Sequence, residues 1–186
     1  MNVICVVPLG SVEDAVLGAI EMCLWQEFGL ETRRLPPLDE PGFAHDAKRM
    51  QYSSELILQM LRKSSPPDAR ALLAVTEKDL FIPMLTFVFG HAQFNGTVGV
   101  VSLARLRQEF YGLPANHPLL LARAMKETVH EVGHIFGLSH CSNPSCPMSL
   151  SNALQQVDRK EEDLCRNCSI VLEEHLHRIS ERNERK

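Results

Sequence analysis

The chain has 186 residues, 45% of them hydrophobic, and its 19 basic and 23 acidic side chains give a formal net charge of −4. This length and composition suit one globular domain with a sizeable core, and the acidic balance predicts no nucleic-acid partner. No stretch approaches the roughly 18 apolar residues of a membrane span, so we expect no membrane partner. The amino terminus has no positively charged region before its short apolar run, which argues against a signal peptide and for a cytoplasmic protein.

The first part of the chain predicts a β-α-β unit. A continuous β-branched run over residues 3–8 fits a buried strand. Apolar residues then recur at helical spacing over 12–28, and Gly29 ends the run. A second short strand is predicted over 31–35, before two prolines. Because a helix connects the two strands, we expect them to pair in parallel.

The remaining elements follow from periodicity and from turn residues. In chain order they are a helix over 46–61, strands over 71–75, 85–90 and 98–103, a short edge segment within 91–95, a long helix from Pro118 to Gly137, an irregular stretch over 138–160 and a last helix over 160–182. Asn95-Gly96 is a hairpin-turn signal after the edge segment. Pro118 suits the first turn of the long helix.

The long helix ends in the motif H-E-x-x-H-x-x-G-x-x-H, which runs from His130 to His140. Residues four apart lie on one face of a helix, so His130 and His134 can bind one metal ion together. Glu131 lies about 100° away around the helix axis, a poor position for a ligand but within reach of a metal-bound water. Gly137 can adopt a positive φ and turn the chain, so that His140 returns as a third ligand. A bare H-E-x-x-H can arise by chance, but the extension to His140 favours a metal site.

Three protein ligands leave one coordination position open for water, which is the arrangement of a catalytic zinc. The metal would lower the pKa of its water to ~7 and polarise a peptide carbonyl. Glu131 would take the proton of this zinc-activated water as general base and return it to the leaving amine as general acid. The oxyanion would be stabilised mainly by the metal.

Four cysteines follow the motif in the pattern C-x4-C-x18-C-x2-C. They are Cys141, Cys146, Cys165 and Cys168. Two short-spaced pairs fit a tetrahedral structural zinc, which would contribute folding free energy to an irregular segment. The alternatives are two disulfides or free core cysteines, which suit a chain without a secretion signal less well, and a nucleophilic Cys141 beside His140. Cys5 and Cys23 lie at apolar positions and are expected to be buried hydrophobic residues.

The other histidines are assigned no part in metal binding. His117 is expected at the surface or as a cap of the long helix. His175 and His177 are expected on the exposed face of the last helix. His91 is a loop residue that could border the cleft.

The histidine motif, together with a methionine shortly after it, resembles the metzincin metallopeptidases. Cys141 directly after the third histidine, Cys146-Pro147-Met148 and the later Cys165-x-x-Cys168 narrow this resemblance to the archaemetzincins. Three upstream segments are also similar to that family, namely residues 75–80, 87–90 and 101–106. The resemblance is specific over roughly residues 70–168.

The resemblance implies an α/β (α+β) fold. It would have a mixed twisted sheet of about five strands, an active-site helix, backing helices and a small zinc-stapled C-terminal subdomain. The chain, 1–186, would be a single metallopeptidase domain with an N-terminal subdomain of about 1–137 and a C-terminal subdomain of about 138–186. An edge strand near the cleft aligns the substrate backbone in metzincins, and residues 91–95 are the candidate for it here.

The same resemblance implies the roles of the site residues. His130, His134 and His140 would bind the catalytic zinc, Glu131 would be the acid and base, and Met148 would be the Met-turn residue under the metal. The four cysteines would hold the second zinc, so the cofactors would be two Zn²⁺ per chain. Some metzincins place a tyrosine two residues after the Met-turn methionine, where this chain has Leu150. No residue is therefore assigned to oxyanion stabilisation besides the metal.

We therefore expect a zinc-dependent metallopeptidase. The alternatives are a non-catalytic zinc protein that binds peptides or partners on the same scaffold, and a zinc hydrolase of another amide. The expected partner is a peptide or protein substrate. Short peptides are favoured, because a core strand that begins at residue 3 leaves no room for an inhibitory propeptide and the cleft itself would have to limit the activity. We expect a monomer.

Overall fold

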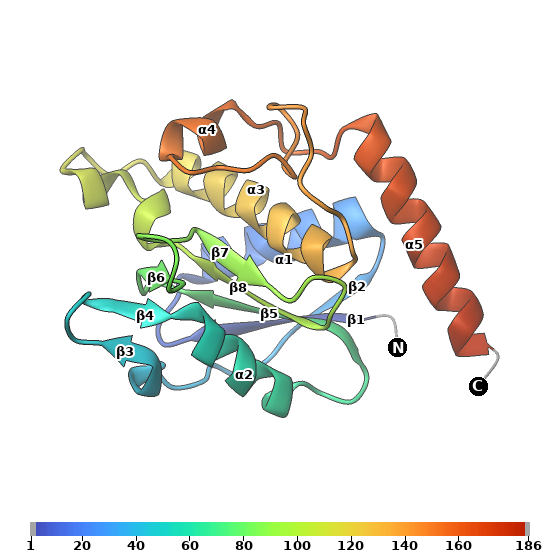
Figure 1. The fold of residues 1–186 in the computed structure, drawn as a ribbon, viewed down its shortest axis with the longest axis horizontal. Coiled ribbons are helices and arrows are strands. Elements are labelled where there is room, and N and C mark those ends of the chain that lie inside the picture. Colours follow the sequence, from blue (N-terminus) through green and yellow to red (C-terminus); the bar gives the residue numbers. More distant parts are fainter. Residues whose placement is uncertain (1–2, 185–186) are drawn as a thin grey trace.

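The main sheet has four parallel strands and one antiparallel edge strand (Figure 1). The computed structural model describes the backbone of residues 3–184 and the side chains of residues 3–178. In spatial order the strands are β2 (Glu31–Arg34), β1 (Val3–Leu9), β5 (Ala69–Thr76), β8 (Val98–Ser102) and β7 (Gly90–Ala92). β1 pairs in parallel with β2 and β5. The predicted β-α-β opening and the mixed sheet of five strands are therefore confirmed.

Both faces of this sheet are covered by helices. Val6 and Leu73 pack on one face with residues of two helices, whereas Val7 and Leu72 pack on the other face with a third. Successive residues of a strand point to opposite sides, so a sheet covered on both faces needs apolar residues at every position. The covering helices are α1 (Asp14–Phe28) and α3 (His117–Ile135) on the first face and α2 (Ser54–Ser64) on the second (Figure 1).

The predicted helix over 46–61 is wrong in its first half. The Asp46 carboxylate accepts hydrogen bonds from the backbone N–H groups of Lys48 and Arg49 at 2.9 and 3.1 Å, as a helix cap would. The turn does not continue into a helix, because Met50 has a φ of +54° and residues 51–53 extend as a strand. The helix α2 begins only after Ser53, whose side chain accepts a hydrogen bond from the backbone N–H of Leu56. The residues before it contribute to a second, small sheet. Its strands are β3 (His45–Asp46), β4 (Gln51–Ser53) and β6 (Leu80–Phe81).

The predicted strand over 85–90 is wrong except at its last residue, where β7 begins. Arg49 donates hydrogen bonds to the backbone carbonyls of Leu85 and Thr86 at 2.7 and 3.2 Å, and Gln51 donates to that of Thr86 at 2.9 Å. Side chains thus bond the carbonyls that a neighbouring strand would bond in a sheet. The irregular residues 82–89 are called the wall segment below.

The C-terminal part is more regular than predicted. The stretch expected to be irregular contains α4 (Leu154–Arg159). The last helix, α5 (Arg166–Glu184), begins six residues later than predicted. Three short 3-10 helices complete the elements of residues 3–184, namely η1 (Gly42–Ala44), η2 (Ala104–Leu106) and η3 (Gln108–Tyr111). In Figure 1, α4 lies over α3, and α5 extends along one side of the molecule. Within the described part of the chain, no helix is long and apolar enough to cross a membrane.

Candidate active site

The histidine motif occupies the C-terminal end of α3 and the turn that follows it. Asn116 caps the start of α3 by accepting a hydrogen bond from the backbone N–H of Leu119 at 3.1 Å, and Pro118 lies in the first turn. Its end is a tight turn in which Gly137 has a φ of +89°. The N–H of Gly137 donates to the carbonyl of His134 and the N–H of Leu138 to that of Gly133, at 3.0 and 2.9 Å. This is a Schellman turn, so the glycine expected to reverse the chain does so.

The three histidines of the motif converge on one point, and their ligand nitrogens lie within 4.8 Å of one another. Nδ1 of His130 donates to the Pro147 carbonyl, and Nδ1 of His134 donates to the Leu138 carbonyl, both at 2.8 Å. Both Nε2 atoms are therefore unprotonated, yet they face each other at 3.1 Å. The ring centroid of His140 lies 5.3 and 4.9 Å from those of His130 and His134. Lone pairs so close repel each other unless a cation lies between them, so this donor set fits zinc.

Burial keeps these imidazoles in the neutral form that metal binding requires. It lowers the pKa of His130 well below its usual value, and it also lowers the pKa of His134 and of His140. The positive charge of Lys160 acts in the same direction on each of the three rings. His140 is the exposed member of the cluster, so the site is open to solvent on its side.

The carboxylate of the motif, Glu131, is only 4% exposed. Its Oε2 atom has no hydrogen-bond partner among the described residues. Burial raises the pKa of Glu131 well above its usual value, the nearby Glu127 raises it further, and Lys160 opposes both effects. An unpartnered buried oxygen is costly in a folded protein. It therefore indicates a group kept for chemistry with a ligand.

Sequence reasoning missed the ion pair between Glu127 and Lys160, whose charged atoms are 3.0 Å apart. Both side chains are buried, at 4% and 0% exposure. Glu127 lies one helical turn before Glu131 and could have been noticed as a second carboxylate on the same face of α3. No local pattern marks Lys160, which lies 33 residues further along the chain.

Two glycines make room for the side chains of the site. A Cβ added at Gly90 would lie 2.5 Å from the Cγ and Oε1 atoms of Glu131. A Cβ added at Gly133 would overlap the sulfur of Met148, a residue that is fully buried. The positions of Glu131 and Met148 thus depend on the absence of side chains at these glycines.

Replacing Gly133 by alanine is expected to lower the free energy of unfolding of the zinc-loaded protein by about 1–3 kcal/mol, because the new methyl group displaces Met148 in a close-packed core. Gly18, inside α1, is the matched control, since an added Cβ there meets nothing within 4 Å. Gly18→Ala should stabilise the protein by about 0.5–1 kcal/mol. Denaturant unfolding measures both effects, and equal stability of Gly133→Ala and the native protein would contradict the contact.

The histidines and Glu131 open into a cavity of about 570 Å³. Residues of the wall segment, β7 and α3 line it. Leu150 and Asn152, which follow the buried Met148 in the chain, also contribute to the lining. His91 lies in β7 and not in a loop as predicted, but it does line the cavity, so its position at the border of the cleft is confirmed. A cavity of this size is typical of a ligand site.

Replacing Arg49 by alanine is expected to loosen the wall segment, because it removes the hydrogen bonds to Leu85 and Thr86 and the stacking of Arg49 on Phe81 at 4.2 Å. Hydrogen exchange of the backbone N–H groups in residues 82–89 should become about tenfold faster, which corresponds to roughly 1.4 kcal/mol for one such bond. Arg33→Ala is the control, since it removes the exposed ion pair with Asp68. Unchanged exchange in Arg49→Ala would show that the wall segment does not depend on Arg49.

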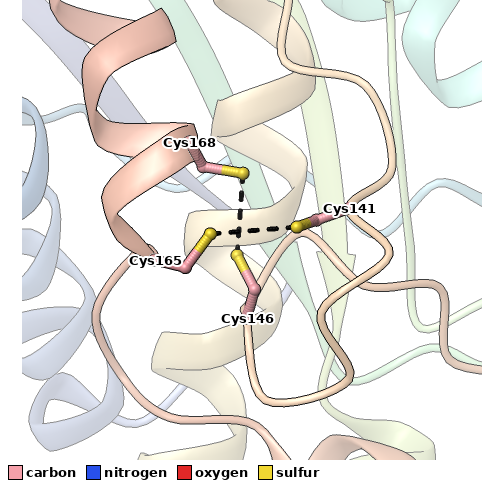
Figure 2. A group of neighbouring side chains, drawn as sticks. All are labelled: Cys141, Cys146, Cys165 and Cys168. Carbon is pink, nitrogen blue, oxygen red and sulfur yellow. Dashed lines mark hydrogen bonds between the residues drawn. The ribbon is translucent and has the colours of Figure 1, made fainter.

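The four cysteines converge on a second point, and their sulfur atoms point toward one another (Figure 2). Cys141 Sγ lies 3.8 Å from Cys165 Sγ, and Cys146 Sγ lies 3.8 Å from Cys168 Sγ. Zn–S bonds of about 2.3 Å in a tetrahedral site separate two sulfur ligands by about 3.8 Å. A disulfide would require about 2.05 Å. The sulfur atoms are therefore spaced for a metal ion and not for disulfides.

The two clusters share one short segment of chain. Cys141 directly follows His140, and its backbone N–H donates to the carbonyl of Met148 at 2.9 Å. Pro147, next to Cys146, accepts the Nδ1–H of a motif histidine. The geometry of each cluster is therefore coupled to that of the other.

The predicted environments of several other side chains can be compared with the structure. Cys5 and Cys23 are buried, as expected. His117 lies at the exposed start of α3, 3.5 Å from a carboxylate oxygen of Glu13. The predicted exposure of His175 is wrong, because its Nδ1 donates to the Phe136 carbonyl at 2.8 Å and links α5 to the end of α3.

Comparison with known proteins agrees with the chemistry of the histidine cluster. The model of Peptidase family M54 matches residues 39–174 of the chain. The matched residues include the site described above. It has two histidines on a helix, a third histidine after a turn and a carboxylate that faces an open cleft. Fold, site and family model together define the class, and the protein is a zinc metallopeptidase.

Relatives and solved structures narrow the class to one family. The archaemetzincin of Methanocaldococcus jannaschii is 43% identical, over 92% of this chain and 93% of the relative, and that of Pyrococcus furiosus is 39% identical over 95% of each. The crystal structure of the Methanopyrus kandleri archaemetzincin has a TM-score of 0.84 at 33% identity and covers 95% of this chain and 96% of that one. That of the Archaeoglobus fulgidus archaemetzincin, complexed with malonate, has a TM-score of 0.79 at 37% identity and covers 91% and 99%. The chain belongs to peptidase family M54, the archaemetzincins.

Proposed function

We propose that this enzyme hydrolyses peptide bonds with Glu131 as general base and acid, and that His130, His134 and His140 hold its catalytic zinc. The position of Glu131 carries the proposal. Its buried carboxylate has an oxygen without a hydrogen-bond partner in the described part of the chain, and it faces the cavity onto which the three imidazoles open. A purely structural zinc needs neither this carboxylate nor an open cavity.

The residues of the chain divide the chemistry between them. When bound, zinc supplies a Lewis acid, which acidifies a water molecule and polarises the substrate carbonyl. Glu131 accepts the proton from the attacking water and delivers it to the leaving amine. Burial and Glu127 hold the pKa of Glu131 well above its usual value, against the opposing charge of Lys160. A raised pKa suits a carboxyl group that must first accept and then donate a proton near neutral pH.

The four cysteines are proposed to hold a second, structural zinc. Their spacing fits four thiolates around one tetrahedral ion, and the closed arrangement offers no open position for a substrate. Met148 is proposed as the Met-turn residue of a metzincin. Its full burial, its packing against Gly133 and its backbone bond to Cys141 support a role in holding the loop between the two clusters.

We further propose that the substrates are short peptides and that the enzyme acts as a monomer in the cytoplasm. The size of the cavity supports a preference for short substrates. The edge strand β7 lines the cavity and pairs with β8 on one side, which supports its role in aligning an extended peptide.

Division of the single domain near residue 137 into two subdomains is part of the same proposal, supported by the sharp turn at Gly137.

A peptide library tests the function directly. The zinc-loaded protein should cleave some short peptides at defined bonds, lose the activity on chelation and regain it with added zinc. Binding of peptides without cleavage would favour the non-catalytic alternative, and cleavage of other amides alone would favour a different hydrolase. Efficient cleavage of folded or denatured proteins of any size would contradict the restriction to short peptides.

A further inference from the structure

A second cavity, of about 450 Å³, lies beside the proposed active-site cleft. Phe87 and Asn152 line both cavities, so the two are neighbours with a common border. An extended peptide advances about 3.3 Å per residue. A peptide lying in the cleft can therefore reach the second cavity with a side chain a few residues from the bond that is cleaved.

The charged groups of this cavity neutralise one another. Arg105 forms two hydrogen bonds with Asp79, at 2.7 and 2.9 Å. Arg123 forms two with Asp158, at 2.6 and 2.8 Å, and donates a third to the Leu106 carbonyl at 2.8 Å. Each lining arginine thus has a carboxylate partner, and a carboxylate or phosphate ligand would have to compete with it. The pairing disfavours an anionic guest.

The rest of the lining combines the amide side chains of Gln108, Asn152 and Gln155 with a larger apolar surface. The Arg105 guanidinium carbon lies 4.2 Å from the ring centroid of Phe87 and 4.6 Å from that of Phe110, so its flat face is covered by aromatic rings. Leu154 contributes to the lining, and Leu113, which is 54% exposed, lies at its rim. Covering exposed apolar side chains of a concave site with an apolar ligand group is favourable, because it removes apolar surface from water.

We propose that the second cavity is a distal subsite, which binds a large apolar side chain of the peptide substrate at a position beyond the two residues that flank the cleaved bond. The inference rests on the proposed peptidase function, because it requires a peptide in the cleft. Phe87 forms the partition between the two cavities. Leu113 and Leu154 are specificity-determining residues that contact the guest side chain.

The test begins with a ten-residue peptide whose cleaved bond has been determined by mass spectrometry with the native zinc-loaded enzyme. Phenylalanine is then placed at each position outside the two residues next to that bond. One position should raise kcat/KM by about tenfold relative to serine, as expected for burying a large apolar side chain. Titration calorimetry with the zinc-loaded Glu131→Gln variant, which should bind the peptides without cleaving them, should show tighter binding for the same position.

Leu154→Trp, which fills the cavity, should abolish the preference in both measurements. Leu113→Glu should also weaken it, and this residue is exposed enough that the substitution leaves folding intact. Leu56→Trp is the control, since Leu56 is exposed on α2 and lines neither cavity. The subsite is refuted if no position is preferred, or if the preference survives both cavity variants. If the native enzyme cleaves no peptide at all, the proposed function fails instead.

Discussion

Replacing Glu131 by glutamine is expected to reduce kcat on a peptide substrate by about 10²–10⁴-fold, because proton transfer by a positioned side chain contributes about that much. The substitution keeps the shape of the side chain and its packing against Gly90. KM should change little, since the proton is transferred only in the transition state. Initial rates of peptide cleavage and zinc content by mass spectrometry measure the effect, and both zinc ions should remain bound.

Glu21→Gln is a matched control for this prediction, because Glu21 forms a surface ion pair with Arg34 that is remote from the cleft. It should leave kcat unchanged. If Glu131→Gln turned over substrate at the native rate with both metals bound, Glu131 would have no part in the mechanism. If it lost the catalytic zinc, the experiment would show that Glu131 positions the ligands, and the proposed division of roles would be wrong.

Replacing Cys165 by serine is expected to remove one of two zinc ions and to destabilise the whole fold. Structural zinc contributes roughly 10–16 kcal/mol of apparent free energy in small zinc domains, and the loss here should be at least several kcal/mol. The catalytic zinc should also bind more weakly. The physical reason is that Cys141 follows His140 directly and that His130 donates to the carbonyl of Pro147 in the same loop.

Zinc stoichiometry, thermal unfolding and competition with a chelator measure these effects separately. Cys5→Ser is the control, since Cys5 is buried away from both clusters. The Cys5→Ser protein should retain two zinc ions. A Cys165→Ser variant that keeps two zinc ions would disprove the four-cysteine site. A variant that stays folded with one zinc ion and native catalytic-zinc affinity would disprove only the coupling between the sites.

Two predicted elements are wrong because periodicity does not report the backbone conformation or the partners of the backbone groups. Residues 46–61 carry apolar residues at helical spacing, but Met50 adopts a φ of +54° and residues 51–53 pair as a strand. Residues 85–90 have the apolar composition of a strand, but Arg49 bonds the carbonyls of Leu85 and Thr86 from a turn more than thirty residues earlier. Periodicity measures which faces are apolar and does not report where each backbone group finds its partner.

The sequence by itself determined the local geometry of the histidine motif. Helical periodicity places His130 and His134 on one face, and the freedom of Gly137 to adopt a positive φ turns the chain toward His140. It also determined the parallel opening and the grouping of the cysteines. The histidine geometry depends on residues close together in the chain, whose relation is set by the backbone of one helix and one turn. The strand pairing and the cysteine group were recognised from the connecting helix and from ligand spacing.

Only the tertiary structure decided what surrounds the motif. The Glu127–Lys160 pair, the wall segment and the second cavity beside Phe87 join residues far apart in the sequence. The burial that shifts the pKa of Glu131 is likewise a property of packing from several elements at once. The spacing of the three histidine ligands depends on one helix and one turn. The electrostatics and the shape of the cleft depend on long-range contacts that no local pattern encodes.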